Sequence, residues 1–214
     1  MTDELRHIIE GTGGATEANL IQTALLYLRE SQTASGKIEK PEFVRKEDEV
    51  KHLIAFASQK RLWYFSIPQE SYIGEGAEQK VYLNEDGKSV IKINDTIFYL
   101  SWQDYFISLL IHNFLFPNTA YQLLGFYQQE NILYSVVKQP FIESTDPTDL
   151  SLLRVFLEKN GFKHKKNNDY FHSELGIILE DLHDENVLTN QGVFFFIDAE
   201  VQRVFTKTWE ILYL

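Results

Sequence analysis

The stretch that most constrains this chain runs from Gly176 to Glu200, where two short apolar strands each lead into a polar loop. Asp181 follows the first strand, Asn186 closes the loop after it, and Asp198 follows the second strand. Aspartate and asparagine are poor strand formers, so we expect them on loops that rigid strands hold in place. The pattern predicts a site built from three oxygen-bearing side chains.

The first part of the chain has helical periodicity. Apolar residues recur at three-four spacing over residues 17–29 and again over residues 46–59, which predicts two helices. Glu47, Asp48 and Glu49 suit the positive N-terminal end of the second helix. Both helices precede every candidate site residue.

From Ser71 onward the period changes to that of strands. Residues 80–83 and 90–93 flank an Asp-Gly turn and predict one hairpin, and residues 121–127 and 132–137 predict another. Between the hairpins, aromatic and aliphatic residues follow helical spacing over residues 101–116. The alternation of helices with antiparallel hairpins predicts an α+β fold.

The last third of the chain begins after Pro140. The pair Asp146-Pro147 has the composition of a helix start, and Asn160-Gly161 has that of a helix end. Residues 162–173 then predict a polar hairpin that leads into a strand over residues 177–179.

Composition excludes several classes of function. The chain has no cysteine, so disulfides, thiolate metal sites and cysteine nucleophiles are ruled out. Its formal charge of −11 argues against sequence-independent nucleic-acid binding, which needs a basic face. The N-terminus lacks the pattern of an export signal, and no apolar run is long enough to span a bilayer. We expect a soluble, cytoplasmic protein with no membrane partner.

The three polar loop residues match the chemistry of phosphoryl transfer. That reaction needs a carboxylate to accept a hydroxyl proton, with an amide and a second carboxylate that hold magnesium against phosphate oxygens. Asp181, Asn186 and Asp198 supply these groups, and oxygen ligands suit magnesium. Taken singly, each of them also fits a turn residue or a strand-end cap.

Two upstream features fit the same chemistry. Gly74 and Gly76 lie in a strand-turn-strand, where backbone amides could approach a phosphate, although an ordinary hairpin turn also takes Gly-x-Gly. Lys92 lies within the apolar strand Val-Ile-Lys-Ile and must reach either solvent or an anion. The order of all these elements favours one shared site over separate structural roles.

In this order the motifs resemble those of the protein-kinase-like superfamily, which implies a two-lobed fold and ATP and Mg²⁺ as cofactors. Gly74-x-Gly76 is similar to the glycine loop, Val-Ile-Lys92 to the strand lysine motif, and Ile-Asp198-Ala to the magnesium aspartate motif. The motif Asp181-Leu-His183-x-x-Asn186 is similar to the catalytic loop of aminoglycoside phosphotransferases. Residues 72–201 resemble most the kinase domain of phage and mobile-element polyvalent proteins.

The resemblance also implies roles for single residues. Gly74, Gly76 and Val81 would cover the nucleotide, and Lys92 would hold its phosphates. Lys138 and Gln139, within residues 137–141, would meet the adenine through backbone groups. Asp181 would be the catalytic base. Asn186 and Asp198 would bind magnesium, and His183 would support the loop.

The chain departs from the kinase pattern at several positions. Gln79 stands at the place of the third glycine, and Glu180 precedes the catalytic aspartate where protein kinases commonly have arginine. Asp104 is the only acidic residue between Thr96 and Gln129 that could replace the helix glutamate that normally pairs with the lysine. We therefore keep Asp104 as a possible supporting residue.

These observations predict three parts: an N-terminal helical extension at residues 1–66, a kinase-like N-lobe at 67–141 and a reduced C-lobe at 142–214. The first hypothesis is an ATP-dependent phosphotransferase that acts on an unknown protein or small-molecule hydroxyl. The alternatives are a nucleotide-binding pseudokinase, because the helix glutamate is missing, and a non-catalytic interaction module, because of the acidic charge and the aromatic run Trp63-Tyr64-Phe65.

Overall fold

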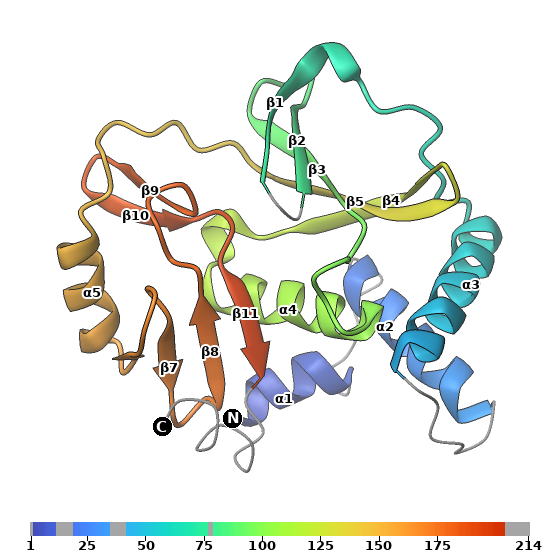
Figure 1. Cartoon of the computed structure of the whole chain (residues 1–214), viewed down its shortest axis with the longest axis horizontal. Coiled ribbons are helices and arrows are strands. Elements are labelled where there is room, and N and C mark those ends of the chain that lie inside the picture. Colours follow the sequence, from blue (N-terminus) through green and yellow to red (C-terminus); the bar gives the residue numbers. More distant parts are fainter. Residues whose placement is uncertain (1, 12–18, 35–41, 77–78, 204–214) are drawn as a thin grey trace.

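A computed structural model describes residues 2–11, 19–34, 42–76 and 79–203. It contains helices and antiparallel sheets, so the predicted α+β class is confirmed (Figure 1). None of the helices in these ranges is long and apolar enough to cross a membrane.

A five-stranded antiparallel sheet, ordered β1-β2-β3-β5-β4, forms the upper part of Figure 1. Its strands are β1 (Tyr72–Glu75), β2 (Gln79–Leu83), β3 (Ser89–Asn94), β4 (Gln122–Gln129) and β5 (Ile132–Pro140). Both predicted hairpins are present. In the β2–β3 turn, Asp86 Oδ1 accepts hydrogen bonds from the backbone N–H groups of Lys88 (2.8 Å) and Ser89 (2.9 Å). Lys92 lies in the centre of the sheet, opposite Val81 on β2 and Val137 on β5.

Gly125, on the edge strand β4, lies directly against the backbone of Leu62. Its φ is +158°, and a Cβ atom there would lie 2.1 Å from the Leu62 carbonyl oxygen. A register shift between Leu123 and Gly125 allows this close approach, and Phe126 N then donates to Leu62 O at 2.8 Å. Only glycine fits this position, because any larger residue would collide with backbone.

Four helices form the layer below the sheet: α1 (Asp3–Glu10), α2 (Leu20–Ala34), α3 (Glu42–Lys60) and α4 (Trp102–Leu115). Residues from all four, including Leu5, Leu25, Phe56 and Trp102, share one apolar core that reaches Val201 near the end of the described chain. The predicted helices at 46–59 and 101–116 are confirmed. The helix predicted at 17–29 begins at Leu20, and residues 17 and 18 lie outside the described ranges.

Glu49 has a different role from the one we expected. The helix α3 begins at Glu42, seven residues earlier than this glutamate, so Glu49 cannot serve its N-terminal end. Its side chain is instead buried, and Oε2 accepts a hydrogen bond from Trp102 N (2.8 Å) at the start of α4. Gln103 and Gln32 each donate to Oε1 at 3.0 Å. A carboxylate of α3 thus caps another helix.

The C-terminal part contains a four-stranded sheet, a separate hairpin and one helix. These elements are α5 (Leu150–Lys159), β6 (Lys163–His164), β7 (Tyr170–His172), β8 (Ile177–Glu180), β9 (Val187–Asn190), β10 (Val193–Phe196) and β11 (Glu200–Arg203). The sheet has the order β11-β8-β7-β6, and β9 pairs with β10. The hairpin predicted within 162–173 is confirmed as β6 and β7.

The predicted start of α5 is wrong by several residues. Asp149 is the N-cap and accepts from the backbone N–H groups of Ser151 (2.8 Å) and Leu152 (3.1 Å). Asp146 instead forms an isolated antiparallel bridge with Thr189, because the segment before the helix runs alongside β9. The predicted end of the helix is correct, since its C-cap is Asn160.

Candidate active site

Asp181 lies where β8 ends and the chain turns sharply. Its φ is +59°, a left-handed conformation that aspartate tolerates better than most residues. Two hydrogen bonds of its backbone hold the turn: Asp181 O accepts from His183 N at 2.9 Å, and Asp181 N donates to the side-chain atom Asp169 Oδ1 at 3.2 Å. The Asp181 side chain is 66% exposed. Its carboxylate can therefore meet a molecule that comes from solvent.

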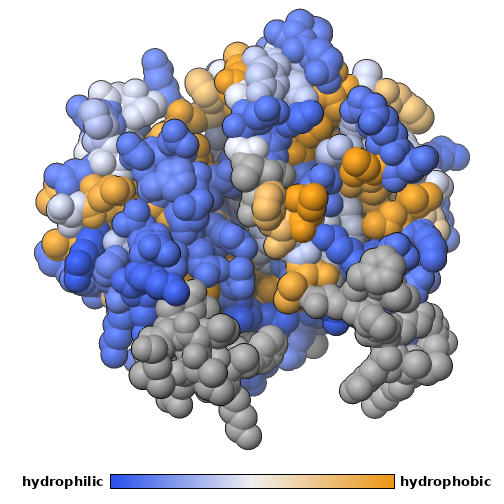
Figure 2. Space-filling model, viewed as in Figure 1, coloured by the Kyte–Doolittle hydropathy of each residue, from blue (hydrophilic) through white to orange (hydrophobic). Residues whose placement is uncertain are grey.

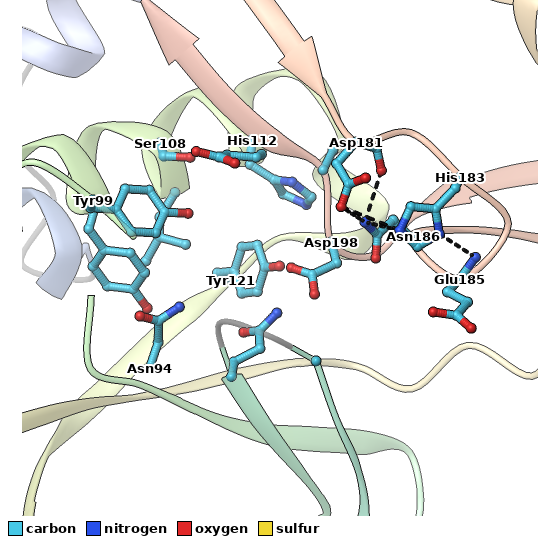
Figure 3. A pocket seen from close by; sticks show the side chains of 16 residues that line it. Asn94, Tyr99, Ser108, His112, Tyr121, Asp181, His183, Glu185, Asn186 and Asp198 are labelled. Atoms are coloured by element: carbon cyan, nitrogen blue, oxygen red, sulfur yellow. Dashed lines mark hydrogen bonds and ion pairs between the residues drawn. The ribbon is translucent and has the colours of Figure 1, made fainter. Parts of the chain in front are cut away.

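Asn186 and His183 hold this carboxylate in place (Figure 3). Asn186 Nδ2 donates to Asp181 O (2.9 Å) and Oδ2 (3.2 Å), and it lies 3.2 Å from His183 Nε2. His183 Nε2 lies 3.3 Å from Asp181 Oδ2. All these contacts of the Asn186 amide use its nitrogen, so its oxygen stays available for another ligand.

The backbone of Asn186 also places Asp198. Asn186 O accepts from Ile197 N (2.9 Å) and Asp198 N (3.3 Å), so the loop after β10 docks onto the loop after β8. The expected convergence of Asp181, Asn186 and Asp198 is therefore observed. Within the described residues, the Asp198 carboxylate has no hydrogen-bond or ion-pair partner, and it faces the cavity (Figure 3).

Lys92 reaches the same place from the sheet. Its side chain is buried, and Nζ donates to Ile197 O at 2.8 Å, one residue before Asp198. Burial lowers the pKa of Lys92, and the negative charge of Asp198 partly restores it. The alternative of a lysine that extends into solvent does not fit this burial.

A cavity of about 420 Å³ lies against these groups. Its aliphatic lining comes from two parts of the chain, with Val81 and Val90 from the five-stranded sheet, and Leu188 and Ile197 from the β9–β10 region. The remaining lining residues include Gly74, Gly76, Lys92, Gln139, Phe141, Asn186 and Asp198. A second cavity of about 270 Å³ adds Asp181 and His183 and shares Gly76, Asn186 and Asp198 with the first. The two cavities adjoin at these shared residues, and we call them together the cleft.

The glycines at the entrance of the cleft are not explained by packing. A Cβ atom at Gly74 or Gly76 would meet nothing within 4 Å, and neither residue has a left-handed φ. Gly76 N donates to Gln79 O at 3.0 Å, which ties the end of β1 to the start of β2. Open space on this side leaves room for a ligand to lie against the backbone.

Two predicted site residues lie apart from the cleft. Lys138 does not line either cavity, whereas its neighbour Gln139 lines the larger one. Asp104 Oδ2 accepts from Ser101 Oγ at 2.5 Å at the start of α4. Burial lowers the pKa of Arg203, and the negative charge of Asp104 partly restores it. Asp104 has no hydrogen bond or ion pair with Lys92 in the described part of the chain.

Further acidic groups lie close to Asp181. Glu180 and Glu200 are directly opposite each other on β8 and β11. Burial raises the pKa of Glu180 to about 7, and the charges of Glu200 and Asp169 act in the same direction. Burial likewise raises the pKa of Glu200. The cleft floor therefore has strongly negative surroundings, which oppose further negative charge unless a cation is present.

A comparison with family models identifies the family of this chain. Residues 46–204 match the family described as Serine/Threonine/Tyrosine Kinase found in polyvalent proteins. The chain belongs to this family. The resemblance to the kinase domain of polyvalent proteins is thereby confirmed, and the matched residues contain every side chain that lines the cleft. A search of curated proteins finds no match.

The donor atoms in the cleft suit a magnesium ion. Among the described residues, no group of three or more histidine, aspartate or glutamate side chains is arranged to hold a metal. Asn186 and Asp198 line both cavities, and neither Asn186 Oδ1 nor the Asp198 carboxylate has a hydrogen-bond partner among the residues that the structure describes. Magnesium in phosphate sites commonly takes one or two protein oxygens and completes its shell with phosphate and water.

No sequence pattern indicated that Tyr121 and His112 belong to the cleft. Tyr121 donates its hydroxyl to Ile197 O at 2.8 Å, and His112 packs against the Tyr121 ring at 4.7 Å between centroids. The Ile197 carbonyl accepts from both Tyr121 and Lys92. Aromatic residues before a strand usually serve the core, so only the spatial arrangement identifies them.

Proposed function

We propose that the chain is an ATP-dependent phosphotransferase that moves the γ-phosphoryl group to a hydroxyl acceptor with the help of Mg²⁺. The observation that carries this proposal is the convergence of Lys92, Asp181, Asn186 and Asp198 on one cleft from three separate segments: β3, the loop after β8 and the loop after β10. The family to which the chain belongs supports the same reaction class.

In this proposal the larger cavity takes the nucleotide. The aliphatic walls of Val81, Val90 and Leu188 would enclose the adenine, and the strand end at Gln139 would lie along its edge. Phe141 N already donates to Lys88 O at 2.9 Å, so this backbone group is not available to a base. Gly74 and Gly76 would lie over the phosphates, because their surface is open.

The charged groups would divide the phosphate chemistry between them. Lys92 would hold phosphate oxygens, and Asn186 Oδ1 with the Asp198 carboxylate would hold Mg²⁺, which neutralises the charge that develops during transfer. Asp181 would accept the proton of the acceptor hydroxyl, since its carboxylate is exposed and oriented by Asn186 and His183.

We also propose that the cleft separates two lobes, as in other kinases. The upper sheet would form an N-lobe at residues 67–141, and the C-terminal strands a reduced C-lobe at residues 142–214. The helices of residues 1–66 would serve as an extension that supports α4. Because these helices share a core with α4, removing them should unfold the chain.

Magnesium-dependent ADP formation tests this function. Asp181→Ala and Asp198→Ala should each lower the rate by at least about 1000-fold, as expected when a base or a metal ligand is lost. Both residues are partly exposed or at a loop, so the variants should remain folded by circular dichroism. Equal ADP formation by the parent and both variants, across a broad panel of acceptors, would contradict the proposal.

One observation favours a second candidate, a nucleotide-binding pseudokinase. Lys92 has no acidic partner on α4, because Asp104 is engaged by Ser101. A ligand at a hundredfold excess over its dissociation constant stabilises the folded state by about 2.7 kcal/mol. A melting shift with Mg²⁺-ATP but no turnover would select this candidate over the enzyme.

A further inference from the structure

Lys92 lies in an environment that differs from the usual lysine-glutamate pair. Its Nζ atom donates to a backbone carbonyl, Ile197 O, and lies 5.4 Å from the centroid of the Tyr121 ring. A cation over an aromatic face is stabilised by the ring electrons, and the effect is larger away from water. Lys92 and Tyr121 are both buried.

The hydroxyl of Tyr121 adds a second link to the same place. It donates to Ile197 O at 2.8 Å, so one carbonyl receives both the tyrosine and the lysine. Burial and the nearby Asp198 raise the pKa of Tyr121 well above its usual range, so the hydroxyl keeps its proton and remains a donor. Figure 3 shows the hydroxyl pointing toward the Asp198 loop.

Tyr121 itself is held by the helix α4. Asn113 Oδ1 accepts from Tyr121 N (2.7 Å), and Asn113 Nδ2 donates to Tyr121 O (2.8 Å), which fixes the backbone on both sides. His112 packs against the ring, and burial lowers the pKa of His112 to about 4. The imidazole is therefore neutral at neutral pH and adds no positive charge beside Lys92.

We propose that Tyr121 is a positioning residue that replaces the missing helix glutamate. Its ring supports the Lys92 ammonium, and its hydroxyl fixes the Ile197-Asp198 peptide so that the Asp198 carboxylate faces the cleft. The chain of contacts Asn113–Tyr121–Ile197 then couples α4 to both the lysine and the metal-binding aspartate. This inference rests on the proposed phosphotransferase function.

Two substitutions separate the two parts of this role. Tyr121→Phe keeps the ring and removes the hydroxyl, so the loop that carries Asp198 loses one buried hydrogen bond. The Mg²⁺ concentration for half-maximal ADP formation should rise about tenfold, whereas ATP affinity measured in EDTA should stay within about twofold. Tyr121→Leu also removes the ring, and ATP affinity in EDTA should then fall about fivefold or more.

Tyr105→Phe is the matched control. Tyr105 is as deeply buried as Tyr121 and lines the smaller cavity, but its hydroxyl forms a 2.7 Å hydrogen bond with Ser135 Oγ and none with the Ile197 carbonyl that carries the Asp198 loop. Loss of the Tyr105 hydroxyl should lower the melting temperature as much as Tyr121→Phe does. It should leave the Mg²⁺ requirement unchanged, because a general loss of stability does not act on the Asp198 loop.

The outcomes distinguish this inference from the function on which it rests. A parent protein that binds no nucleotide and forms no ADP overturns both. The parent protein can instead bind nucleotide and form ADP. In that case, an equal Mg²⁺ requirement in Tyr121→Phe and Tyr105→Phe, together with parental ATP affinity in Tyr121→Leu, overturns only the role of Tyr121. A higher Mg²⁺ requirement in Tyr121→Phe only, with weaker ATP binding in Tyr121→Leu, supports it.

Discussion

The buried carboxylate of Glu49 offers a direct test of how the N-terminal helices support the site. Glu49 on α3 accepts hydrogen bonds from Trp102 N, Gln103 Nε2 and Gln32 Nε2, and its side chain is almost fully buried. Replacing Glu49 with alanine removes both carboxylate oxygens and with them all three hydrogen bonds. It also removes a negative charge from the positive N-terminal end of α4.

The cost can be worked out from these contacts. The Trp102 N–H is left buried without a partner, which costs about 1–3 kcal/mol, and the lost charge at the helix end adds about 0.3–1 kcal/mol. Burial raises the pKa of Glu49, so the cost of keeping its charge away from water offsets part of the stabilisation that the carboxylate provides. We therefore expect Glu49→Ala to lower the free energy of unfolding by about 2–3 kcal/mol.

Urea unfolding followed by circular dichroism measures this loss. With an m-value of roughly 2 kcal/mol per molar urea, the midpoint should fall by about 1–1.5 M. Glu47→Ala is the control, because Glu47 lies on the same helix and is exposed, so the change in charge is the same and the midpoint should move little. Equal midpoints for the two variants would refute the role assigned to Glu49.

Two other changes test the fold and its charges. Gly125→Ala should cost about 3 kcal/mol or more, because its Cβ would collide with Leu62 O, whereas Gly74→Ala should leave the urea midpoint unchanged. Burial and the charge of Glu200 raise the pKa of Glu180 to about 7. The neutral carboxyl group therefore stabilises the folded state; this contribution is complete below about pH 4.5 and is lost as pH rises through 7. Glu180→Gln should therefore match the parent at pH 5 and exceed it by about 1 kcal/mol at pH 8, after allowance for solvent screening; equal stability at both pH values would count against the raised pKa.

Local sequence patterns predicted most of the secondary structure and the loop positions of the candidate site residues. The hairpins around Asp86-Gly87, the helix at 101–116 and the loop positions of Asp181 and Asp198 all depend on turn chemistry or periodicity over a few residues. The helix α1 carried similar signals, with Thr2 as N-cap and Gly11 at its end, but its short length concealed it.

Long-range contacts could not be predicted in this way. The bond from Trp102 N to Glu49 joins residues 53 apart, and that from Tyr121 to Ile197 joins residues 76 apart. In sequence, Glu49 has the pattern of an ordinary helix-start carboxylate and Tyr121 that of a core aromatic. Asp146-Pro147 has the composition of a helix start, but the bridge to Thr189 keeps it extended. In each case a tertiary partner decides between two local roles that the sequence allows equally.

The exposed apolar residues do not identify a binding partner. Apolar side chains gather near the centre of the face shown in Figure 2, and the loop between β3 and α4 carries three exposed ones, Ile97, Phe98 and Leu100. In the run Trp63-Tyr64-Phe65, only Phe65 is largely exposed, at 91%. Trp63 donates its indole N–H to Ser58, and Tyr64 N bonds Phe126 O, so both serve the fold.

Calorimetric titration of ATP into the intact chain, with and without Mg²⁺, tests the central claim most directly. If Lys92, Asn186 and Asp198 form one nucleotide site, ATP should bind at one molecule per chain, Mg²⁺ should strengthen the binding, and Asp198→Ala should abolish the effect of Mg²⁺ while ATP still binds. Heat of binding that is absent in the parent, or a Mg²⁺ effect that persists unchanged in Asp198→Ala, would contradict it.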